Sequence, residues 1–315
     1  MISIIGCGYW GKNLIRTVNS LNYLYSVHDL DSELQKNFQQ ELKLENLSYE
    51  EMLVNDNVKG VMIATSANTH YDLALECLEN NKHVFIEKPI CLDLNEGEHL
   101  REISKEKKLT LMVGHLLQYH SHFIRLKEMV KGKELGDIVK IKSTRKSFGI
   151  IRDYEDVVWS FAPHDLSMII SLIEKEEPTN FSVRRSKYFN ENTDKALINF
   201  KMGAVVIDIE VDWTSIEKKQ SLEIYGEKGV LVFEDSNPDS TKKLAYFNKK
   251  FSRNELKLKN TSQPKYILID ENINPLQNEC KHFIDCMSKN SQPITDASEA
   301  LAVLKVLLKL EKING

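Results

Sequence analysis

A glycine-rich turn near the start of the chain constrains the fold more than any other feature. The β-branched run Met1–Ile5 leads directly into Gly6-x-Gly8-x-x-Gly11, and a helical pattern follows over residues 12–20. The first glycine permits a tight turn, the second lets a pyrophosphate approach the backbone, and the third lets helix and strand pack closely. A dinucleotide site is therefore expected, against the alternative of glycines kept for packing alone. The expected contacts are Gly6, Gly8, Tyr9, Trp10 and Gly11.

An acidic residue, Asp29, ends the second apolar run, eighteen residues beyond Gly11. A carboxylate at this place accepts hydrogen bonds from the adenosine ribose diol and repels a 2′-phosphate, which favours NAD over NADP. The alternative is that Asp29 caps the helix expected over residues 31–43. NAD is thus the expected cofactor.

The order of strands and helices divides the 315 residues into about two domains. Strands alternate with helices in the first third of the chain, which predicts βαβ units and a parallel sheet. After about residue 118 a helix is followed by strand-like stretches with short turns, a solvated loop over 235–266 and two closing helices. The expected fold is an α/β Rossmann domain, 1–118, and an α+β domain with a large, mostly antiparallel open sheet, 119–315. The C-terminal helix could pack back on the first domain.

Charge and cysteine content exclude several classes of protein. The 46 acidic and 42 basic residues give a net charge of −4, whereas duplex-binding proteins carry a basic excess. No apolar stretch approaches the ~18 residues of a membrane span, and no basic leader precedes the first apolar run. Five cysteines without a CxxC pair predict reduced thiols in a cytoplasmic protein. His120-x-His122 is poorly spaced for chelation on a helix, so no metal is expected.

The tripeptide Glu87-Lys88-Pro89 follows the strand expected over residues 84–86. It would therefore stand at the carboxyl edge of the sheet, where open α/β sheets bind their ligands. Proline holds the preceding Lys88 in an extended conformation, and an ammonium group there can stabilise a developing alkoxide or exchange its proton. The alternative is an ordinary loop.

The glycine turn, the segment Ala64-Thr-Ser-Ala-Asn-Thr-His70 and Glu87-Lys88-Pro89 together resemble the glucose–fructose oxidoreductase/inositol dehydrogenase (Gfo/Idh/MocA) family. The resemblance implies that Lys88 is catalytic and that the second domain carries the substrate groups. It also implies a homodimer or homotetramer through the C-terminal sheet. Ser66 stands where the family often has proline. The resemblance places on the cofactor side Thr65, Ser66, Asn68, His70 and Glu87.

A third motif is Trp159-Ser-Phe-Ala-Pro-His164-Asp165. Residues 161–173 are expected to form a helix entered through Pro163, with His164 at its N-terminus, where the helix dipole disfavours a protonated imidazole. A neutral His164 could act as a general base, or it could be a structural residue. The family has an aspartate four residues before this histidine, and here that position is Ser160. The resemblance therefore implies that His164 assists Lys88.

Further segments resemble bacterial sugar-nucleotide 3-dehydrogenases, among them Gly114–Ser121 and Asn278–Cys286. Ser121 stands where the usual phrase has proline. Arg145 and Arg152 are candidates for a sugar diphosphate, since guanidinium forks match phosphate oxygens, or else they are solvated charges. Tyr119 and His120 could contact sugar hydroxyls or pack in the core. The full set of candidate substrate residues is Tyr119, His120, Arg145, Arg152, Trp159 and Asp165.

These expectations combine into an NAD-dependent sugar dehydrogenase or reductase that moves a hydride at C3 of a UDP-N-acetylhexosamine or its uronic acid. One alternative is oxidation of a free sugar or polyol such as inositol, and another is reduction of a 3-ketosugar. A hydrolase with transient NAD oxidation and an NAD-binding protein without turnover also stay open. Neither nucleic acid nor a membrane is expected as a partner.

Overall fold

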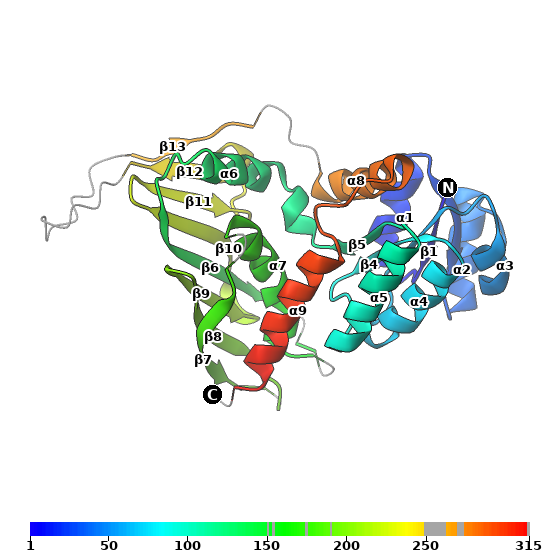
Figure 1. The fold of residues 1–315 in the computed structure, drawn as a ribbon, viewed down its shortest axis with the longest axis horizontal. Helices are drawn as coiled ribbons and strands as arrows, with labels where there is room; N and C mark the ends of the chain where they lie inside the picture. Colours follow the sequence, from blue (N-terminus) through cyan, green and yellow to red (C-terminus); the bar gives the residue numbers. More distant parts are fainter. Residues whose placement is uncertain are drawn as a thin grey trace, which may run out of the picture. The chain divides into compact units, whose positions relative to one another are not determined.

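The computed structural model describes residues 1–149, 151–152, 155–173, 176–189, 191–248, 263–269 and 274–313. The chain forms two compact units (Figure 1). The first comprises Met1–Tyr119 and Ile273–Leu304, and the second comprises His120–Asn272 and Lys305–Gly315. Each unit is built around one sheet. The first unit thus takes in a C-terminal segment as well as the N-terminal third of the chain.

The sheet of the first unit has the strand order β2-β1-β3-β4-β5, and every neighbouring pair is parallel, as the alternation predicts. The chain leaves β1 toward one edge and returns beside it as β3, so the strand order reverses at this point. The strands are β1 Ile2–Ile5, β2 Leu24–His28, β3 Gly60–Ile63, β4 His83–Glu87 and β5 Leu111–Gly114. The helices between them are α1 Gly11–Ser20, α2 Ser32–Leu42, α3 Tyr49–Val54, α4 His70–Glu79 and α5 Leu94–Glu106. Short 3-10 turns precede α4, at Ala67–Thr69, and follow β5, at Leu116–Tyr119.

Side-chain caps fix where these helices begin. Asp31 accepts hydrogen bonds from the first backbone N–H groups of α2, and Asp93 does the same for α5. Ser48 and Glu51 form a reciprocal capping box at α3. These caps agree with the helix starts expected from the sequence.

The C-terminal segment completes the core of the first unit. Helix α8, Pro275–Lys289, places Leu276, Cys280 and Phe283 in the apolar cluster that includes β1 and β4. The rings of Phe85 and Phe283 meet edge to face, with their centroids 5.9 Å apart. Beyond α8, Thr295 lies along the outer edge of β5, where its carbonyl accepts the N–H of Val113.

The sheet of the second unit has the order β13-β12-β11-β10-β6-β9-β8-β7. All neighbouring strands are antiparallel except the pair β6 and β9, so the mostly antiparallel open sheet is confirmed. Its longer strands are β6 Ile138–Phe148, β7 Pro178–Ser186, β8 Lys195–Met202, β9 Val205–Asp212 and β10 Thr214–Gly226. The shorter ones are β11 Val230–Glu234, β12 Leu244–Phe247 and β13 Lys265–Tyr266.

The loop expected over residues 235–266 is wrong in part. It contains a 3-10 turn at Ser240–Lys242 and the strands β12 and β13, while residues 249–262 lie outside the described part of the chain. Leu244 and Ala245 are buried in register with Phe233 and Val232. Two buried residues amid polar neighbours are too few to give a recognisable alternation, which explains the error.

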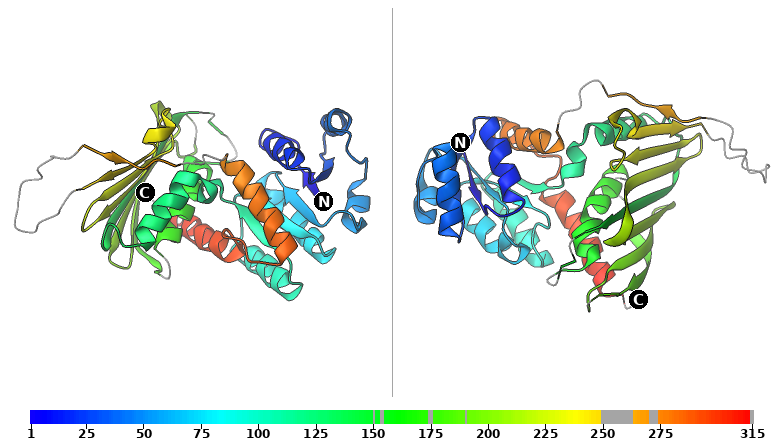
Figure 2. Two further views of the ribbon diagram at one scale, coloured as in Figure 1. Left: turned by 90° about the horizontal axis from the view of Figure 1, so that it is seen from above. Right: turned by 180° about the vertical axis from the view of Figure 1, so that it is seen from behind.

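Two helices, α6 Ser121–Lys131 and α7 Val157–Leu172, lie on one face of this sheet (Figures 1 and 2). Alternation along β8 and β9 directs Ile198, Phe200 and Ile209 toward that face and charged residues to the other. Arg185 donates to the carbonyls of Leu310 and Ile313 at the end of α9, Ala297–Glu311.

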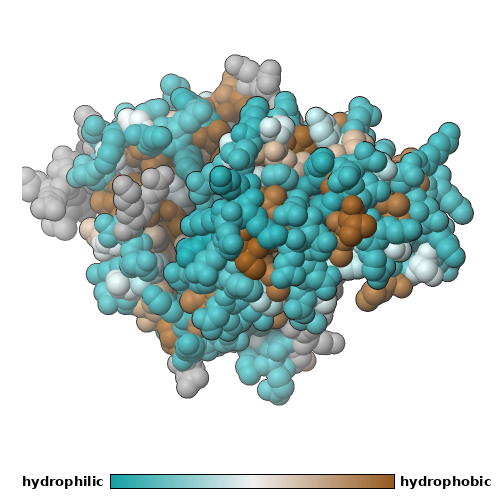
Figure 3. All heavy atoms as spheres, turned by 45° about the vertical axis from the view of Figure 1, so that its right-hand side comes forward, coloured by the Kyte–Doolittle hydropathy of each residue, from teal (hydrophilic) through white to brown (hydrophobic). Residues whose placement is uncertain are grey.

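Among the described residues, no helix combines the length and the apolar character needed to cross a membrane. The face drawn in Figure 3 is mainly hydrophilic, with small, separate apolar patches. All five cysteines are buried, and none forms a disulfide.

Candidate active site

The three glycines of the N-terminal turn differ in what surrounds them. A Cβ at Gly6, whose φ is +96°, would lie 2.6 Å from the carbonyl oxygen of Ala64, and one at Gly11 would lie 1.9 Å from that of Gly6. At Gly8 a Cβ would meet nothing within 4 Å. Gly6 and Gly11 are therefore needed for packing, whereas Gly8 leaves open space beside the backbone. No side chain caps α1 and no acidic residue stands in its first turn, so its N-terminal N–H groups suit a pyrophosphate.

The carboxylate of Asp29 is oriented by the backbone of this turn. One oxygen accepts the N–H of Cys7 at 2.6 Å, and the other accepts the N–H of Asp31 at 2.9 Å. Asp31, not Asp29, caps α2, so the capping alternative for Asp29 is wrong. The next residue in the chain is the exposed Leu30, so this position supplies no cation to pair with a 2′-phosphate.

Glu87, the residue before Lys88, is hydrogen-bonded to Trp10 of the glycine turn. The indole N–H of Trp10 donates to the carboxylate of Glu87 at the end of β4. Burial of that carboxyl raises the pKa of Glu87 to about 7, although the Trp10 hydrogen bond and the charge of Lys88 act in the opposite direction. The Lys88–Pro89 peptide bond is cis. Trp10 thus joins two motifs that lie far apart in the sequence.

His70 joins the same motif to the segment after β3. Its ring nitrogens lie 2.7 Å from the carbonyl oxygen of Pro89 and 3.1 Å from that of Thr65, and the residue is only 1% exposed. Burial lowers the pKa of His70. The ring is enclosed between two loops, so the expected place of His70 on the cofactor side stays a prediction. Ser66 and Asn68 are exposed in the same segment, and Thr65 bonds to the Thr69 hydroxyl.

His164 lies on α7, but not at its N-terminus. The helix begins at Val157 and is capped by Asp156, which accepts the N–H of Trp159. His164 therefore stands about two turns inside the helix, and Pro163 lies within it. The expected start at residue 161 is wrong because Pro163 suggested a first turn. The argument from the helix dipole fails with it, while His164 is partly exposed between buried helix neighbours.

Arg145 and Asp165 are paired with each other. The guanidinium of Arg145 donates to both carboxylate oxygens of Asp165, at 2.8 and 3.1 Å, and the hydroxyl of Ser143 donates to one of them at 2.6 Å. Arg145 is 7% exposed and Asp165 is 1% exposed. Their charges are buried and satisfied by each other, so this structure lends no support to substrate contact by either side chain, which stays a prediction.

Arg152 is held against the start of α7. One guanidinium nitrogen donates to Glu155 and, at 2.5 Å, to the hydroxyl of Ser160. Ser160 and His164 are four residues apart on α7 and so lie on the same helix face. Arg152 is partly exposed, unlike Arg145, and Trp159 on the adjoining turn is partly exposed as well.

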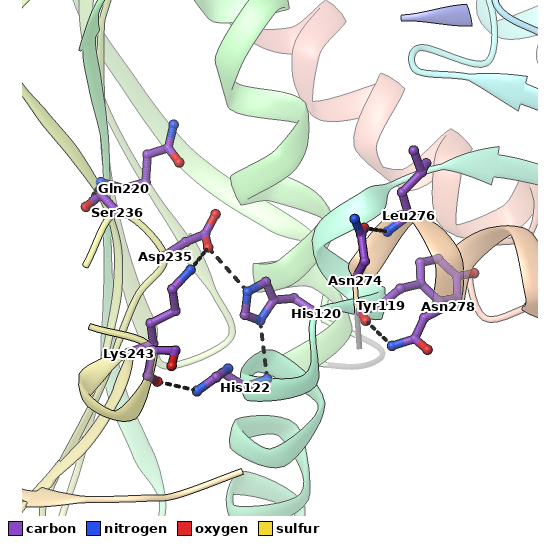
Figure 4. Close-up of polar contacts among 11 residues, drawn as sticks. Tyr119, His120, His122, Gln220, Asp235, Ser236, Lys243, Asn274, Leu276 and Asn278 are labelled. Atoms are coloured by element: carbon purple, nitrogen blue, oxygen red, sulfur yellow. Dashed lines mark hydrogen bonds and ion pairs between the residues drawn. The ribbon is translucent and has the colours of Figure 1, made fainter. Parts of the chain in front are cut away.

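Tyr119 and His120 are engaged in structural contacts (Figure 4). Tyr119 is 3% exposed, and its hydroxyl bonds to Thr295, which fits the core-packing alternative. His120 caps α6 by accepting the N–H of His122, so its other ring nitrogen donates to Asp235 at 3.3 Å. Burial raises the pKa of Asp235, but the hydrogen bonds from His120 and Lys243 outweigh it and hold the pKa low. Because His120 precedes the helix, its ring lies beside that of His122, contrary to expectation.

Comparison with known sequences decides the family. Residues 1–115 match the profile of an oxidoreductase family with an NAD-binding Rossmann fold, and residues 123–232 match the Gfo/Idh/MocA C-terminal domain. The chain belongs to the Gfo/Idh/MocA family. Its N-terminal Rossmann domain is accordingly an NAD-binding one, which confirms the expected cofactor and enzyme class.

Relatives in the Gfo/Idh/MocA family differ in what they act on. Myo-inositol 2-dehydrogenase of Thermotoga maritima is 24% identical over 76% of each chain. The structure of UDP-N-acetylglucosamine 3-dehydrogenase GnnA from Acidithiobacillus ferrooxidans superposes with a TM-score of 0.85 at 19% identity, covering 98% of this chain and 95% of that one. GenD2 from gentamicin A biosynthesis, solved in complex with NAD, has a TM-score of 0.81 at 15% identity over 98% and 91%. At these identities the structures establish the fold.

One residue of this Gfo/Idh/MocA chain has a chemistry that the sequence reasoning missed. Glu279 on α8 is completely buried, and neither carboxyl oxygen has a hydrogen-bond partner among the residues that the structure describes. Burial and the nearby charge of Glu87 raise the pKa of Glu279 well above its usual value. The sequence does carry a sign of this burial, because Glu279 shares a helix face with the apolar residues Leu276, Cys280 and Phe283.

Proposed function

We propose that the protein is an NAD(H)-dependent oxidoreductase that transfers a hydride between C3 of a nucleotide-activated sugar and nicotinamide. The observation that carries the proposal is the link from the glycine turn through Trp10 to Glu87, which holds Lys88 at the carboxyl end of β4. Lys88 thereby belongs to the rigid edge of the NAD-binding sheet, where parallel sheets bind ligands. Such a reaction would serve amino-sugar or surface-polysaccharide biosynthesis.

The open space at Gly8, the uncapped N-terminus of α1 and the oriented carboxylate of Asp29 fit a pyrophosphate and a ribose diol. Gly6, Gly8, Gly11 and Asp29 would hold the cofactor, which when bound accepts or returns the hydride. The exposed Ser66 and Asn68 are further candidates for contact.

Lys88 is proposed to hold the reacting hydroxyl group and take its proton, assisted by His164. An ammonium group that donates to an alkoxide stabilises the charge developing on oxygen as the hydride leaves carbon. His164 is suited to exchange that proton because imidazole titrates near neutral pH. The position of Ser160 removes an aspartate-based relay, so His164 acts without one.

Arg152 is the remaining candidate for the negative charge of a sugar diphosphate or uronate. Its partial exposure supports this assignment, whereas Arg145 is buried and paired with Asp165. The relative named as a UDP-N-acetylglucosamine 3-dehydrogenase supports a nucleotide sugar as substrate. The relative named as myo-inositol 2-dehydrogenase favours the second candidate, a free polyol. Reduction of a 3-ketosugar would use the same residues.

The deciding experiment is a screen of UDP-N-acetylhexosamines, their uronic acids and free polyols with NAD, followed at the NADH absorbance. The proposal predicts turnover of a nucleotide sugar with a ketone at C3, identified by NMR of the product. Turnover of inositol alone would select the polyol alternative. Lys88→Ala should reduce the rate about 10³-fold or more while NAD still binds. If Lys88→Ala left the rate unchanged, a non-catalytic or lysine-independent function would replace this proposal.

The protein is further proposed to work in the cytoplasm as a homodimer or homotetramer formed through the sheet of the second unit. The sheet face opposite α6 and α7 supports this, since it exposes Val206 beside ion pairs such as Lys140 with Asp208. A mixed apolar and charged face of this kind is suited to pairing with a second copy.

A further inference from the structure

The buried group formed by Ser143, Arg145 and Asp165 fixes one point of α7 to the sheet. Asp165 accepts three hydrogen bonds, one from the Ser143 hydroxyl and two from the guanidinium of Arg145. Both donors stand on β6, at alternate positions that face α7. A bidentate guanidinium–carboxylate pair restricts direction as well as distance.

Apolar packing also holds α7 against the sheet. Ala162, Leu166 and Ile169 are buried, and such packing is not directional. A helix held only by these residues could rotate or slide slightly at little cost. The fork to Asp165 is a directional contact between α7 and β6. His164 is the residue directly before Asp165, so whatever fixes Asp165 also fixes the backbone that carries the imidazole.

Stability alone does not explain such a pair. Buried ion pairs can often be replaced by apolar residues of similar volume without loss of stability, because desolvation of the charges offsets their attraction. Directional positioning is the property that an apolar replacement would not supply. Both side chains are buried, and each already satisfies the charge of the other.

We infer that Arg145 and Asp165, with Ser143, are positioning residues that hold the imidazole of His164 in its working place. The inference rests on the proposed role of His164 in proton transfer. A displacement of about 1 Å in a reacting group costs on the order of 10²-fold in rate, so loss of the fork should lower kcat and leave substrate binding nearly intact.

The first test is NMR of the NAD-bound protein with all nine histidines labelled at imidazole Cε1. His164→Gln identifies the resonance of His164 by its disappearance. Arg145→Lys keeps the positive charge but removes the fork, and it should shift or broaden that resonance and alter its titration. Arg184→Lys, an exposed arginine on β7, is the matched control and should leave it in place. An unmoved His164 resonance in Arg145→Lys would overturn the inference.

The second test is a double-mutant cycle of NADH formation, with whichever of UDP-N-acetylglucosamine and myo-inositol the protein oxidises. Arg145→Lys should lower kcat about tenfold or more with KM within twofold of the wild type. In the His164→Gln background the same substitution should change the rate by less than twofold. An equal loss in both backgrounds shows that Arg145 does not act through His164 and rejects the inference.

A milder variant covers the case in which Arg145→Lys does not fold. Ser143→Ala removes one of the three hydrogen bonds to Asp165 and takes the place of Arg145→Lys in both tests, with the same criteria. A His164→Gln enzyme with the wild-type rate would instead reject the proposed role of His164. The NMR comparison would then still decide whether the pair holds the ring.

Discussion

At the scale of single residues, Gly8 and Gly11 stand three positions apart and are constrained by different things. Gly11 has the backbone of Gly6 against the place where its Cβ would be, whereas Gly8 has open space there. The two glycines therefore separate the requirements of folding from those of ligand binding within one turn.

Gly8→Ala should leave the free energy of unfolding of the apoprotein within about 0.5 kcal/mol of the wild type, since the added methyl meets no protein atom. The same methyl enters the space expected for the pyrophosphate, so NAD affinity should fall about tenfold or more. Denaturant titration and calorimetric NAD binding measure the two quantities. Gly11→Ala is the counterpart and should lose several kcal/mol of stability, on the order of 3. An unchanged NAD affinity in Gly8→Ala would show that the pyrophosphate does not lie against this turn.

Glu279 predicts a dependence of stability on pH. The pKa of Glu279 is raised in the folded protein, so the folded state binds its proton more tightly than the unfolded state does. Stability is therefore lost as pH rises above the unfolded value of about 4.3, and Glu87 adds a loss that ends near pH 7. Glu279→Gln should be more stable than the wild type at pH 8 and equal to it at pH 4. Thermal unfolding at both pH values tests this, with the exposed Glu45→Gln as control. A difference that does not grow with pH would show that Glu279 is not protonated in the core.

At the scale of elements, helix α7 shows what local sequence conveys and what it does not. Asp156 caps this helix before Val157, whereas Pro163 resembles a first-turn residue and led to the expected start at residue 161. The strands of the first sheet are short, continuously buried apolar runs, whereas β8 and β9 of the second sheet alternate in burial with period two, and both patterns can be recognised in a sequence. The pairing of Arg145 with Asp165 joins residues twenty positions apart in different elements, and no spacing rule reports such a contact.

For the candidate active site, too, the sequence predicts local features better than contacts between distant segments. Gly6, Gly8, Gly11 and Asp29 follow from a local motif, because one turn contains all the geometry they need. The engagement of Arg145, Tyr119 and His120 in internal contacts depends on how distant segments pack. A sequence shows that a side chain can donate a hydrogen bond, but not that Thr295 or Asp235 already accepts or shares it.

The ion pair between α7 and β6 predicts that losing one charge destabilises the protein more than losing both. Asp165→Asn leaves the guanidinium of Arg145 buried without its counter-charge, and it should cost about 3–5 kcal/mol of stability. Arg145→Met combined with Asp165→Leu removes both charges and should recover most of that loss. Urea unfolding of the single and double variants measures the difference. If both proteins lost the same free energy of unfolding, the unpaired charge of Arg145 would not be the cause of the loss.

At the scale of the whole molecule, the first unit contains the glycine turn of the NAD-binding domain, and the second unit contains His164, the proposed catalytic histidine. The sequence predicts a domain boundary after residue 118, and whether the parts on either side fold independently stays a prediction. The first unit draws on both ends of the chain, Met1–Tyr119 and Ile273–Leu304, a division that no local pattern announces.

The proposed assembly through the second sheet predicts a mass of two or four chains in solution. Val206→Asp places a charge on the open face of β9 and should shift light scattering behind gel filtration toward the monomer. Val54→Asp, on an exposed position of α3, is the matched control and should leave the mass unchanged. A wild-type protein that elutes as a monomer would reject the assembly outright.

The return of residues 273–304 to the first unit has a consequence for synthesis of the chain. On the ribosome the N-terminal βα repeats emerge first, but Phe283 and its neighbours on α8 complete their core only after the whole antiparallel domain has been translated. Nascent chains must therefore keep an unfinished nucleotide-binding core for most of elongation. A nonsense mutation near residue 270 would damage that core first, although the codon lies far from the glycine turn.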